Sequence, residues 1–206
     1  MKILSHRGYW NESIEKNSLV AFTRSLELRF GLETDVRDCA GRLVVSHDMP
    51  SGSEMGLDRV ISLFHDTDFT LAVNIKADGM AARLKSAFSS CNVKSWFAFD
   101  MSIPDMRSYL DEKLPVFARV SEVEREPAWI EEVSGIWLDS FNADQYDISR
   151  ISKFLEDGKL VCVVSPELHR WSYEPLWDAI KPLSDQAGLM LCTDYPEEAW
   201  RFFMQA

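Results

Sequence analysis

Short apolar runs rich in β-branched residues recur along the chain and alternate with stretches of helix-like spacing. This alternation is typical of a parallel sheet whose strands are joined by crossover helices. The predicted strands are residues 2–6, 32–37, 70–76, 96–100, 116–120, 135–139, 160–165 and 189–193. Eight alternations of strand and helix predict an α/β fold of the (β/α)8 class, the TIM barrel, with short loops.

The segments between these strands carry helix signals. Leu19, Phe22 and Leu26 fall on one helical face, Ser102 is a candidate N-cap, and Pro196 suits a first helical turn. The doubly wound sheet is the alternative architecture. It normally carries a glycine-rich turn after its first strand, whereas Gly8 stands alone here.

A further apolar run at residues 43–47 follows Ala40 and Gly41 closely and is not counted among the barrel strands. It is either the second arm of a hairpin or a continuation beyond the barrel wall.

The chain has 206 residues, of which 46% are apolar and 27% are charged, as in a globular protein with a sizeable core. This length predicts a single domain over residues 1–206. Lys and Arg total 22 against 33 for Asp and Glu, and the net charge of -11 argues against nucleic acid or an anionic membrane surface as the main partner. A phosphate-bearing substrate would need a local positive pocket or a metal.

The cysteines are scattered along the chain: Cys39, Cys91, Cys162 and Cys192. Their spacing suggests neither a zinc motif nor a disulfide framework, so reduced thiols are expected. The first residues contain no apolar stretch long enough for a signal peptide, and no run approaches the roughly 18 residues of a transmembrane helix. A cytoplasmic protein without a transmembrane segment is therefore expected.

In a barrel of this class the active site lies at the carboxyl ends of the strands. Polar side chains collect at the ends of the predicted strands: His6, Arg7, Glu33, Asp35, Asn74, Lys76, Asp100, Arg119, Asp139, Glu167 and Asp194. Strand ends are polar in many barrels, so this clustering indicates where to look without identifying the chemistry.

Glu33 and Asp35 form the sharpest feature because alternation places both carboxylates on the same face of one strand. Two inward carboxylates repel unless a cation neutralises them. Their oxygen ligands favour Mg²⁺ or Ca²⁺ over Zn²⁺. The alternative is a pair on the wet face of an edge strand.

His6 and His47 each end an apolar run and lack the spacing of a metal-binding helix. A general acid or base role therefore suits them better than metal ligation. The plainer alternative is that each is an ordinary residue of the barrel rim.

Four ordered segments together resemble the glycerophosphodiester phosphodiesterase family. They are Ser5-His6-Arg7-Gly8, Asn17-Ser18 with Ala21-Phe22, Gly31-Leu32-Glu33-Thr34-Asp35-Val36 and Val44-Val45-Ser46-His47-Asp48. Weaker similarities follow at Ile75-Lys76, Phe99-Asp100 and Thr193-Asp194-Tyr195-Pro196-Glu197, so the resemblance spans most of the chain.

The resemblance implies a (β/α)8 barrel that hydrolyses a phosphodiester bond with a divalent cation and two histidines. It makes His6 and His47 the general acid and base, and it makes Arg7 and Lys76 the groups that hold phosphate oxygens. The attacking oxygen would be either a neighbouring substrate hydroxyl, which yields a cyclic phosphate, or water.

The same resemblance assigns Glu33 and Asp35 to the metal. The third metal ligand of the family is a Glu two residues before the strand lysine, and here that position is Asn74. An amide oxygen can coordinate Mg²⁺ or Ca²⁺, but the site loses one negative charge. The usual Pro-Glu-Asn segment of the family also differs, because Lys16 precedes Asn17.

The expected substrate is a small-molecule phosphodiester of the glycerophosphodiester type, or a phosphate-containing glycan or lipid head group. Lys16 and Asn74 keep a second hypothesis open, a catalytically impaired barrel that only binds a phosphate ligand. The family usually inserts a long segment after the His-Asp pair, and only residues 49–69 are available here. Lipid-directed relatives similar to phospholipase D share that shortening, although they are usually secreted and carry disulfides.

Overall fold

The computed structural model describes residues 1–142 and 146–204 and shows a (β/α)8 barrel. Eight strands pair in the order β5-β4-β2-β1-β9-β8-β7-β6, and neighbouring strands along this path are parallel. The barrel strands are β1 (Lys2–Ser5), β2 (Gly31–Cys39), β4 (Leu71–Ile75), β5 (Trp96–Phe99), β6 (Phe117–Val120), β7 (Gly135–Leu138), β8 (Leu160–Val164) and β9 (Leu189–Thr193). All eight predicted strands are confirmed.

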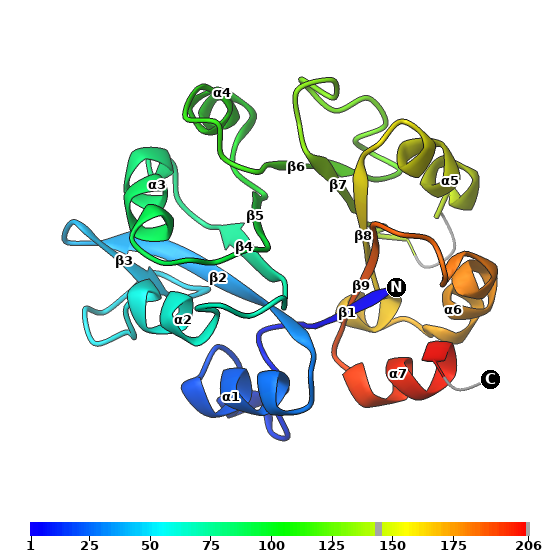
Figure 1. Cartoon of the computed structure of the whole chain (residues 1–206), viewed down its shortest axis with the longest axis horizontal. Coiled ribbons are helices and arrows are strands. Elements are labelled where there is room, and N and C mark those ends of the chain that lie inside the picture. Colours follow the sequence, from blue (N-terminus) through cyan, green and yellow to red (C-terminus); the bar gives the residue numbers. More distant parts are fainter. Residues whose placement is uncertain (143–145, 205–206) are drawn as a thin grey trace.

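The helices lie around the outside of the strands (Figure 1). They are α1 (Leu19–Glu27), α2 (Leu57–Leu63), α3 (Ala81–Ser89), α4 (Ile103–Asp111), α5 (Ile148–Glu156), α6 (Glu174–Ile180) and α7 (Pro196–Met204), with 3₁₀ turns η1 (Ser13–Glu15), η2 (Pro166–His169) and η3 (Lys181–Leu183). Residues 121–134, which join β6 to β7, form turns and bends. Because the sheet closes on itself through a bridge between β5 and the residue before β6, the doubly wound alternative is wrong.

The run at residues 43–47 contains β3 (Arg42–Val45), which pairs antiparallel with the outer half of β2. Val36 is the point of change, because it pairs with Ile75 of β4 on one side and with Val45 on the other. The hairpin interpretation is thus the correct one. Its return arm brings the chain back toward the carboxyl ends of the barrel strands.

The sequence also predicts where two helices begin. Ser18 Oγ accepts a hydrogen bond from Ala21 N at the start of α1, and Ser102 Oγ accepts one from Asp105 N at the start of α4. These caps satisfy backbone donors that an isolated helix end would leave unpaired. Pro196 begins α7, as expected.

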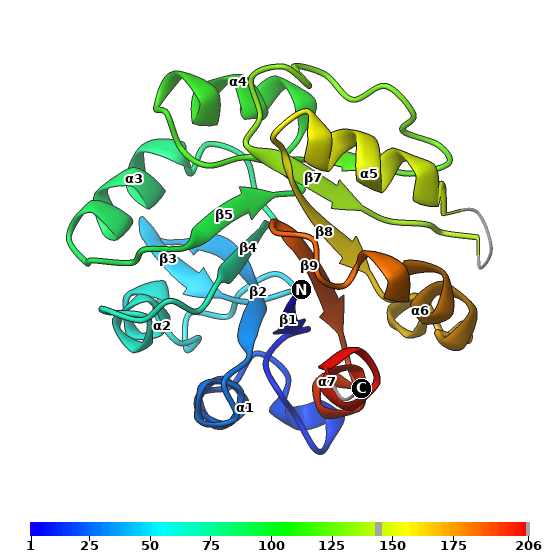
Figure 2. The ribbon, with the colours of Figure 1, turned by 45° about the vertical axis from the view of Figure 1, so that its right-hand side comes forward.

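The seam between β5 and β6 closes the barrel with little backbone pairing. Ala98 forms a parallel bridge with Val116, and its N–H donates to Pro115 O at 2.9 Å. Figure 1 labels both strands, and Figure 2 shows β5 among the green elements of the barrel. Inside, Phe97 of β5 stacks on Phe117 of β6, with ring centroids 3.7 Å apart. Packing of aromatic side chains therefore holds β5 and β6 together, whereas backbone hydrogen bonds hold the other neighbouring strands together.

Gly135 is required beside this stack. A Cβ at this position would lie 2.5 Å from the Phe117 ring and 2.6 Å from Leu160 O. Apart from this aromatic interior, apolar side chains pack between the outer wall of the barrel and the helices. No helix in the described part of the chain is long and apolar enough to cross a bilayer.

Replacing Phe117 with Ala should lower the free energy of unfolding by about 3–5 kcal/mol, because it removes a buried ring and leaves a cavity at the weakly paired seam. Urea denaturation followed by circular dichroism measures this loss. Ile14→Ala is the matched control, since that side chain is 86% exposed and its removal should change stability by about 0.5 kcal/mol or less. Equal effects of the two variants would contradict the role given to the stack.

Candidate active site

The polar residues predicted at the strand ends come together at the carboxyl end of the barrel. Glu33 and Asp35 both lie on β2 and are buried, with 1% and 0% exposure. Asp35 is paired in register with Asn74 of the neighbouring strand β4. The edge-strand alternative for the carboxylate pair is therefore wrong.

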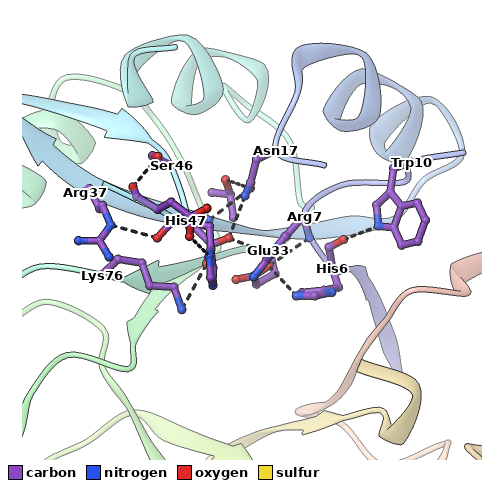
Figure 3. Close-up of polar contacts among 12 residues, drawn as sticks. His6, Arg7, Trp10, Asn17, Glu33, Arg37, Ser46, His47 and Lys76 are labelled. Atoms are coloured by element: carbon purple, nitrogen blue, oxygen red, sulfur yellow. Dashed lines mark hydrogen bonds and ion pairs between the residues drawn. The ribbon is translucent and has the colours of Figure 1, made fainter. Parts of the chain in front are cut away.

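Asp35 is the centre of a network that joins three segments of the chain. Its Oδ2 lies 2.9 Å from Arg7 Nε and accepts a hydrogen bond from Asn17 Nδ2 at 2.8 Å. Its Oδ1 lies 3.3 Å from Lys76 Nζ. Figure 3 shows Arg7 and Asn17, from the connection between β1 and α1, and Lys76, from the end of β4, near the same point. Two cations thus neutralise one buried carboxylate.

Local backbone geometry explains how Arg7 and Asn17 reach this point. Both adopt the left-handed conformation, with φ of 57° and 59°, and Asn17 N donates to Arg7 O at 2.9 Å. Between them, Gly8 has φ of 80°, and a Cβ there would lie 2.8 Å from Ala21 Cβ. Glycine is therefore required at position 8 by both conformation and space.

Thr34 orients the Asn17 amide. Its hydroxyl donates to Asn17 Oδ1 at 2.9 Å, which turns the Asn17 NH₂ group toward Asp35. Asn17 of one motif and Thr34 and Asp35 of another are thus joined by hydrogen bonds.

Glu33 lies deeper than Asp35 and faces the first loop. Its Oε2 accepts a hydrogen bond from Arg7 N at 3.1 Å and lies 3.9 Å from His6 Nε2. Burial, followed by the negative charge of Asp35, raises the pKa of Glu33 to about 7. This carboxylate would be favoured in its ionised form by a cation placed beside it.

His6 is held by a carboxylate that the sequence does not place beside it. Its Nδ1 is 2.8 Å from Asp194 Oδ1, at the end of β9. Asp194 is held in turn, because its N–H donates to Glu167 Oε1 at 3.0 Å. The His6 carbonyl accepts a hydrogen bond from Trp10 Nε1 at 3.2 Å. With Nδ1 facing Asp194, Nε2 is left for proton transfer.

His47 follows β3 and is more open to solvent. Its side chain is 47% exposed, and its Nδ1 lies 2.9 Å from Asp48 Oδ1. Its carbonyl accepts a hydrogen bond from Arg37 Nε at 3.0 Å. In the view of Figure 3, His47 lies on the β3 side of Glu33 and His6 lies on the other side.

The buried oxygens at this mouth fit a hard divalent cation. Glu33 Oε1 and Asn74 Oδ1 are buried without a hydrogen-bond partner, and the contact given for buried Asp35 Oδ1 is the ion pair with Lys76 Nζ at 3.3 Å. Unpartnered buried oxygens are costly unless another group satisfies them. Within the described residues no three His, Cys, Asp or Glu side chains form a metal-binding group, so a third protein ligand would be the Asn74 amide.

Lys16, which stands where the resembled family has an acidic residue in its Pro-Glu-Asn segment, faces an aromatic ring. Its Nζ lies 4.3 Å from the centroid of the Trp10 ring. The Lys16 ammonium therefore lies over the face of the Trp10 ring, which attracts it electrostatically. The partners of the His6 ring are Asp194 and Glu33.

A third histidine-carboxylate pair, which the sequence does not predict, lies on the far half of the mouth. His169 Nε2 lies 2.8 Å from Asp139 Oδ1, and the ring of His169 meets Phe141 edge to face. Nearby, Arg119 Nη1 lies 3.4 Å from Asp100 Oδ1. Asp139 was recognised only as a strand end, and no local signal links it to a histidine 30 positions away.

The His169–Asp139 pair makes stability depend on pH. The hydrogen bond that His169 donates to Asp139 raises the pKa of His169 above its ordinary value of 6.5. A group with a raised folded-state pKa stabilises fully below its unfolded pKa, and this stabilisation is lost as pH rises through the folded-state pKa. The difference in unfolding free energy between the wild type and His169→Gln should therefore be full below the ordinary histidine pKa and should shrink as the pH rises above it.

Denaturant titrations at several pH values measure this difference. His65→Gln is the control, because the His65 side chain is 59% exposed. A difference that stays constant with pH would contradict the assignment of the protonated form to this pair.

Comparison with known proteins adds evidence on the fold. No family model and no curated protein matches the sequence. A candidate glycerophosphodiester phosphodiesterase from Galdieria sulphuraria matches at a TM-score of 0.75 and 18% identity, over 99% of this chain and 98% of that chain. An Oleispira antarctica phosphodiesterase in complex with sn-glycerol-3-phosphate matches at 0.69 and 15%, over 100% and 97%.

A Ca²⁺-dependent phosphatidylinositol-specific phospholipase C from Streptomyces antibioticus matches at a TM-score of 0.58 and 10% identity, over 98% of this chain and 95% of that chain. At sequence identities this low, the matches are evidence for a shared fold. The chain therefore has the (β/α)8 barrel fold of glycerophosphodiester phosphodiesterases, in agreement with the resemblance of its motifs.

Proposed function

We propose that the protein is a metal-dependent phosphoric diester hydrolase that cleaves a glycerophosphodiester-like substrate by paired-histidine acid-base catalysis. One observation carries the proposal: two buried carboxylates, Glu33 with an unpartnered oxygen and Asp35, lie beside His6, Arg7 and Lys76 at the mouth of a barrel. The shared fold with phosphodiesterases supports it.

Arg7 and Lys76 are the groups we assign to the substrate phosphate. Both lie within ion-pair distance of Asp35, so two positive charges stand at the mouth of a chain whose net charge is -11. Phosphate oxygens would share these two cations with Asp35. Their charge would also stabilise the negative charge on the phosphoryl oxygens in the transition state.

His6 and His47 are the proposed acid and base. Asp194 fixes the ring of His6 through Nδ1, which leaves Nε2 to accept or donate a proton. His47 is held by its backbone and by Asp48 on the β3 side. One imidazole would deprotonate the attacking oxygen, and the other would protonate the departing alkoxide.

Glu33, Asp35 and Asn74 would hold the divalent cation, Mg²⁺ or Ca²⁺. When bound, the cation supplies positive charge to the phosphate and lowers the barrier to attack. The three residues provide the oxygen ligands that such ions prefer. Two of these ligands are anionic, and the amide completes the set without adding charge.

The second hypothesis is a catalytically impaired barrel that only binds a phosphate ligand. Its support is Asn74, which removes one negative charge from the cation site. Lys16 supports it less, because that cation lies over Trp10 and the His6 ring keeps two carboxylate neighbours. The geometry therefore favours the enzyme.

The ligand class is a small phosphodiester or a phosphate-bearing lipid or glycan head group. The four cysteines are free thiols, which fits a reducing compartment such as the cytoplasm.

Chelation should abolish hydrolysis of bis-nitrophenyl phosphate, and Mg²⁺ or Ca²⁺ should restore it.

Asn74→Glu adds a third carboxylate to the proposed cation site and should therefore tighten cation binding in a calorimetric titration. An active enzyme should then need less cation for full rate, whereas a binding-only barrel would bind cation better and hydrolyse nothing. Unchanged cation affinity would show that Asn74 does not face the ion.

His6→Ala and His47→Ala should each lower turnover of the same substrate by about 10²-fold to 10⁴-fold, since each imidazole handles one proton. Circular dichroism should show that both variants fold. His65→Ala is the matched control and should keep the wild-type rate. Near-normal turnover in both site variants would place the chemistry on other residues.

A further inference from the structure

Exposed apolar side chains gather at the end of the barrel that carries the candidate site. The most exposed are Ile14 at 86%, Met49 at 81% and Val123 at 70%. Ile14 lies in the connection after β1, Met49 in the connection after β3 and Val123 in the connection after β6. All three connections lie at the carboxyl end of the barrel.

Three further connections at this end add an exposed apolar residue. Ile103 begins α4 and is 56% exposed, Phe141 follows β7 and is 41% exposed, and Trp171 follows β8 and is 47% exposed. We call Ile14, Met49, Ile103, Val123, Phe141 and Trp171 the apolar rim. Scattered exposed apolar residues are common, but their placement on loop after loop around one opening is not.

The other end of the barrel differs. Among the described residues, its exposed large apolar side chains include Leu28 at 42% and Trp200 at 46%, which match Phe141 and Trp171 but lie well below Ile14, Met49 and Val123. Trp200 and Met204 line a cavity of about 230 Å³ with Met1, at the amino ends of the strands. These apolar side chains already have neighbours in a hollow of the protein.

The apolar rim and the candidate site share the same loops. Ile14 lies between Arg7 and Asn17, which both contact Asp35, and Met49 is two residues after His47. A surface that contacts the apolar rim therefore meets the opening through which a phosphodiester enters. Residues 46–56 lead from β3 to α2 and leave this rim uncovered, with Met49 and its neighbours exposed.

Charge indicates which kind of lipid surface fits. The chain carries a net charge of -11, which repels anionic bilayers. Asp48 beside the apolar rim has a side chain that is 93% exposed, and Glu12 is exposed in the first loop. These carboxylates complement the cationic ends of choline or ethanolamine head groups. Aromatic and aliphatic side chains next to charged groups are typical of interfacial binding.

We propose that the apolar rim seats the barrel mouth on a zwitterionic phospholipid surface, so that the site takes its phosphodiester from a lipid at the interface. The proposal rests on the proposed function and adds the substrate class. The apolar rim side chains enter the head-group region, and the loops that carry Arg7 and His47 approach the lipid phosphates.

The test is cosedimentation of the full chain with phosphatidylcholine vesicles. The wild type should bind, and the double variant Ile14→Asp with Val123→Asp should bind about tenfold more weakly, because two apolar side chains leave the interface. The matched control, Leu28→Asp with Met204→Asp, changes two exposed apolar residues away from the rim and should bind like the wild type. Phosphatidylglycerol vesicles should bind the wild type less than phosphatidylcholine vesicles do.

Hydrolysis of soluble bis-nitrophenyl phosphate separates this proposal from the proposed function. The apolar rim variant should keep that activity, while hydrolysis of vesicle lipid falls with its binding. Absence of wild-type binding to phosphatidylcholine, or equal loss of binding in the control, would overturn the rim proposal even if soluble hydrolysis persists. Vesicle binding with no soluble hydrolysis at any cation concentration would instead overturn the proposed function.

Discussion

The buried carboxylate of Asp35 is the interaction on which the mouth of this barrel depends. A buried charge is tolerated only when it is paired and hydrogen-bonded, and removing a partner costs several kcal/mol. Arg7 and Asn17 from the first loop and Lys76 from the end of β4 meet this requirement. The strained backbone of that loop follows from it, because only left-handed residues and Gly8 let the chain fold back over α1. The same ion pairs hold Arg7 and Lys76 at the opening, where their charges would bind the phosphate of the proposed substrate.

The barrel holds this arrangement with backbone pairing that is continuous except at one seam. Parallel ladders run from β5 through β4, β2, β1, β9, β8 and β7 to β6. Only the β5–β6 seam relies mainly on stacked aromatic rings. The His6–Asp194 and His169–Asp139 pairs have the same 2.8 Å nitrogen-oxygen distance, one in each half of the mouth. Proton-handling groups therefore stand on both sides of the opening.

Charge is distributed so that an acidic molecule can still handle phosphate. The excess of carboxylates is spread over the surface, whereas Arg7 and Lys76 are drawn inward by one buried acid. A cation between Glu33, Asp35 and Asn74 would complete the neutralisation and release Arg7 and Lys76 to the substrate. The apolar rim stands around this polar centre. An opening of this kind suits a substrate with a charged phosphodiester and an apolar remainder.

The sequence by itself determined the positions of all eight barrel strands, the inward face shared by Glu33 and Asp35, and the helix starts at Ser18, Ser102 and Pro196. These features follow from periodicity and from hydrogen bonds across a few residues, which local patterns encode. Only the tertiary structure decided which polar groups meet. His6 and Asp194 lie 188 positions apart, and His169 reaches Asp139 across 30. The gathering of the apolar rim at one opening was likewise decided by closure of the barrel. Closure brings strand ends from the whole chain to one place, and no local pattern records which of them become neighbours.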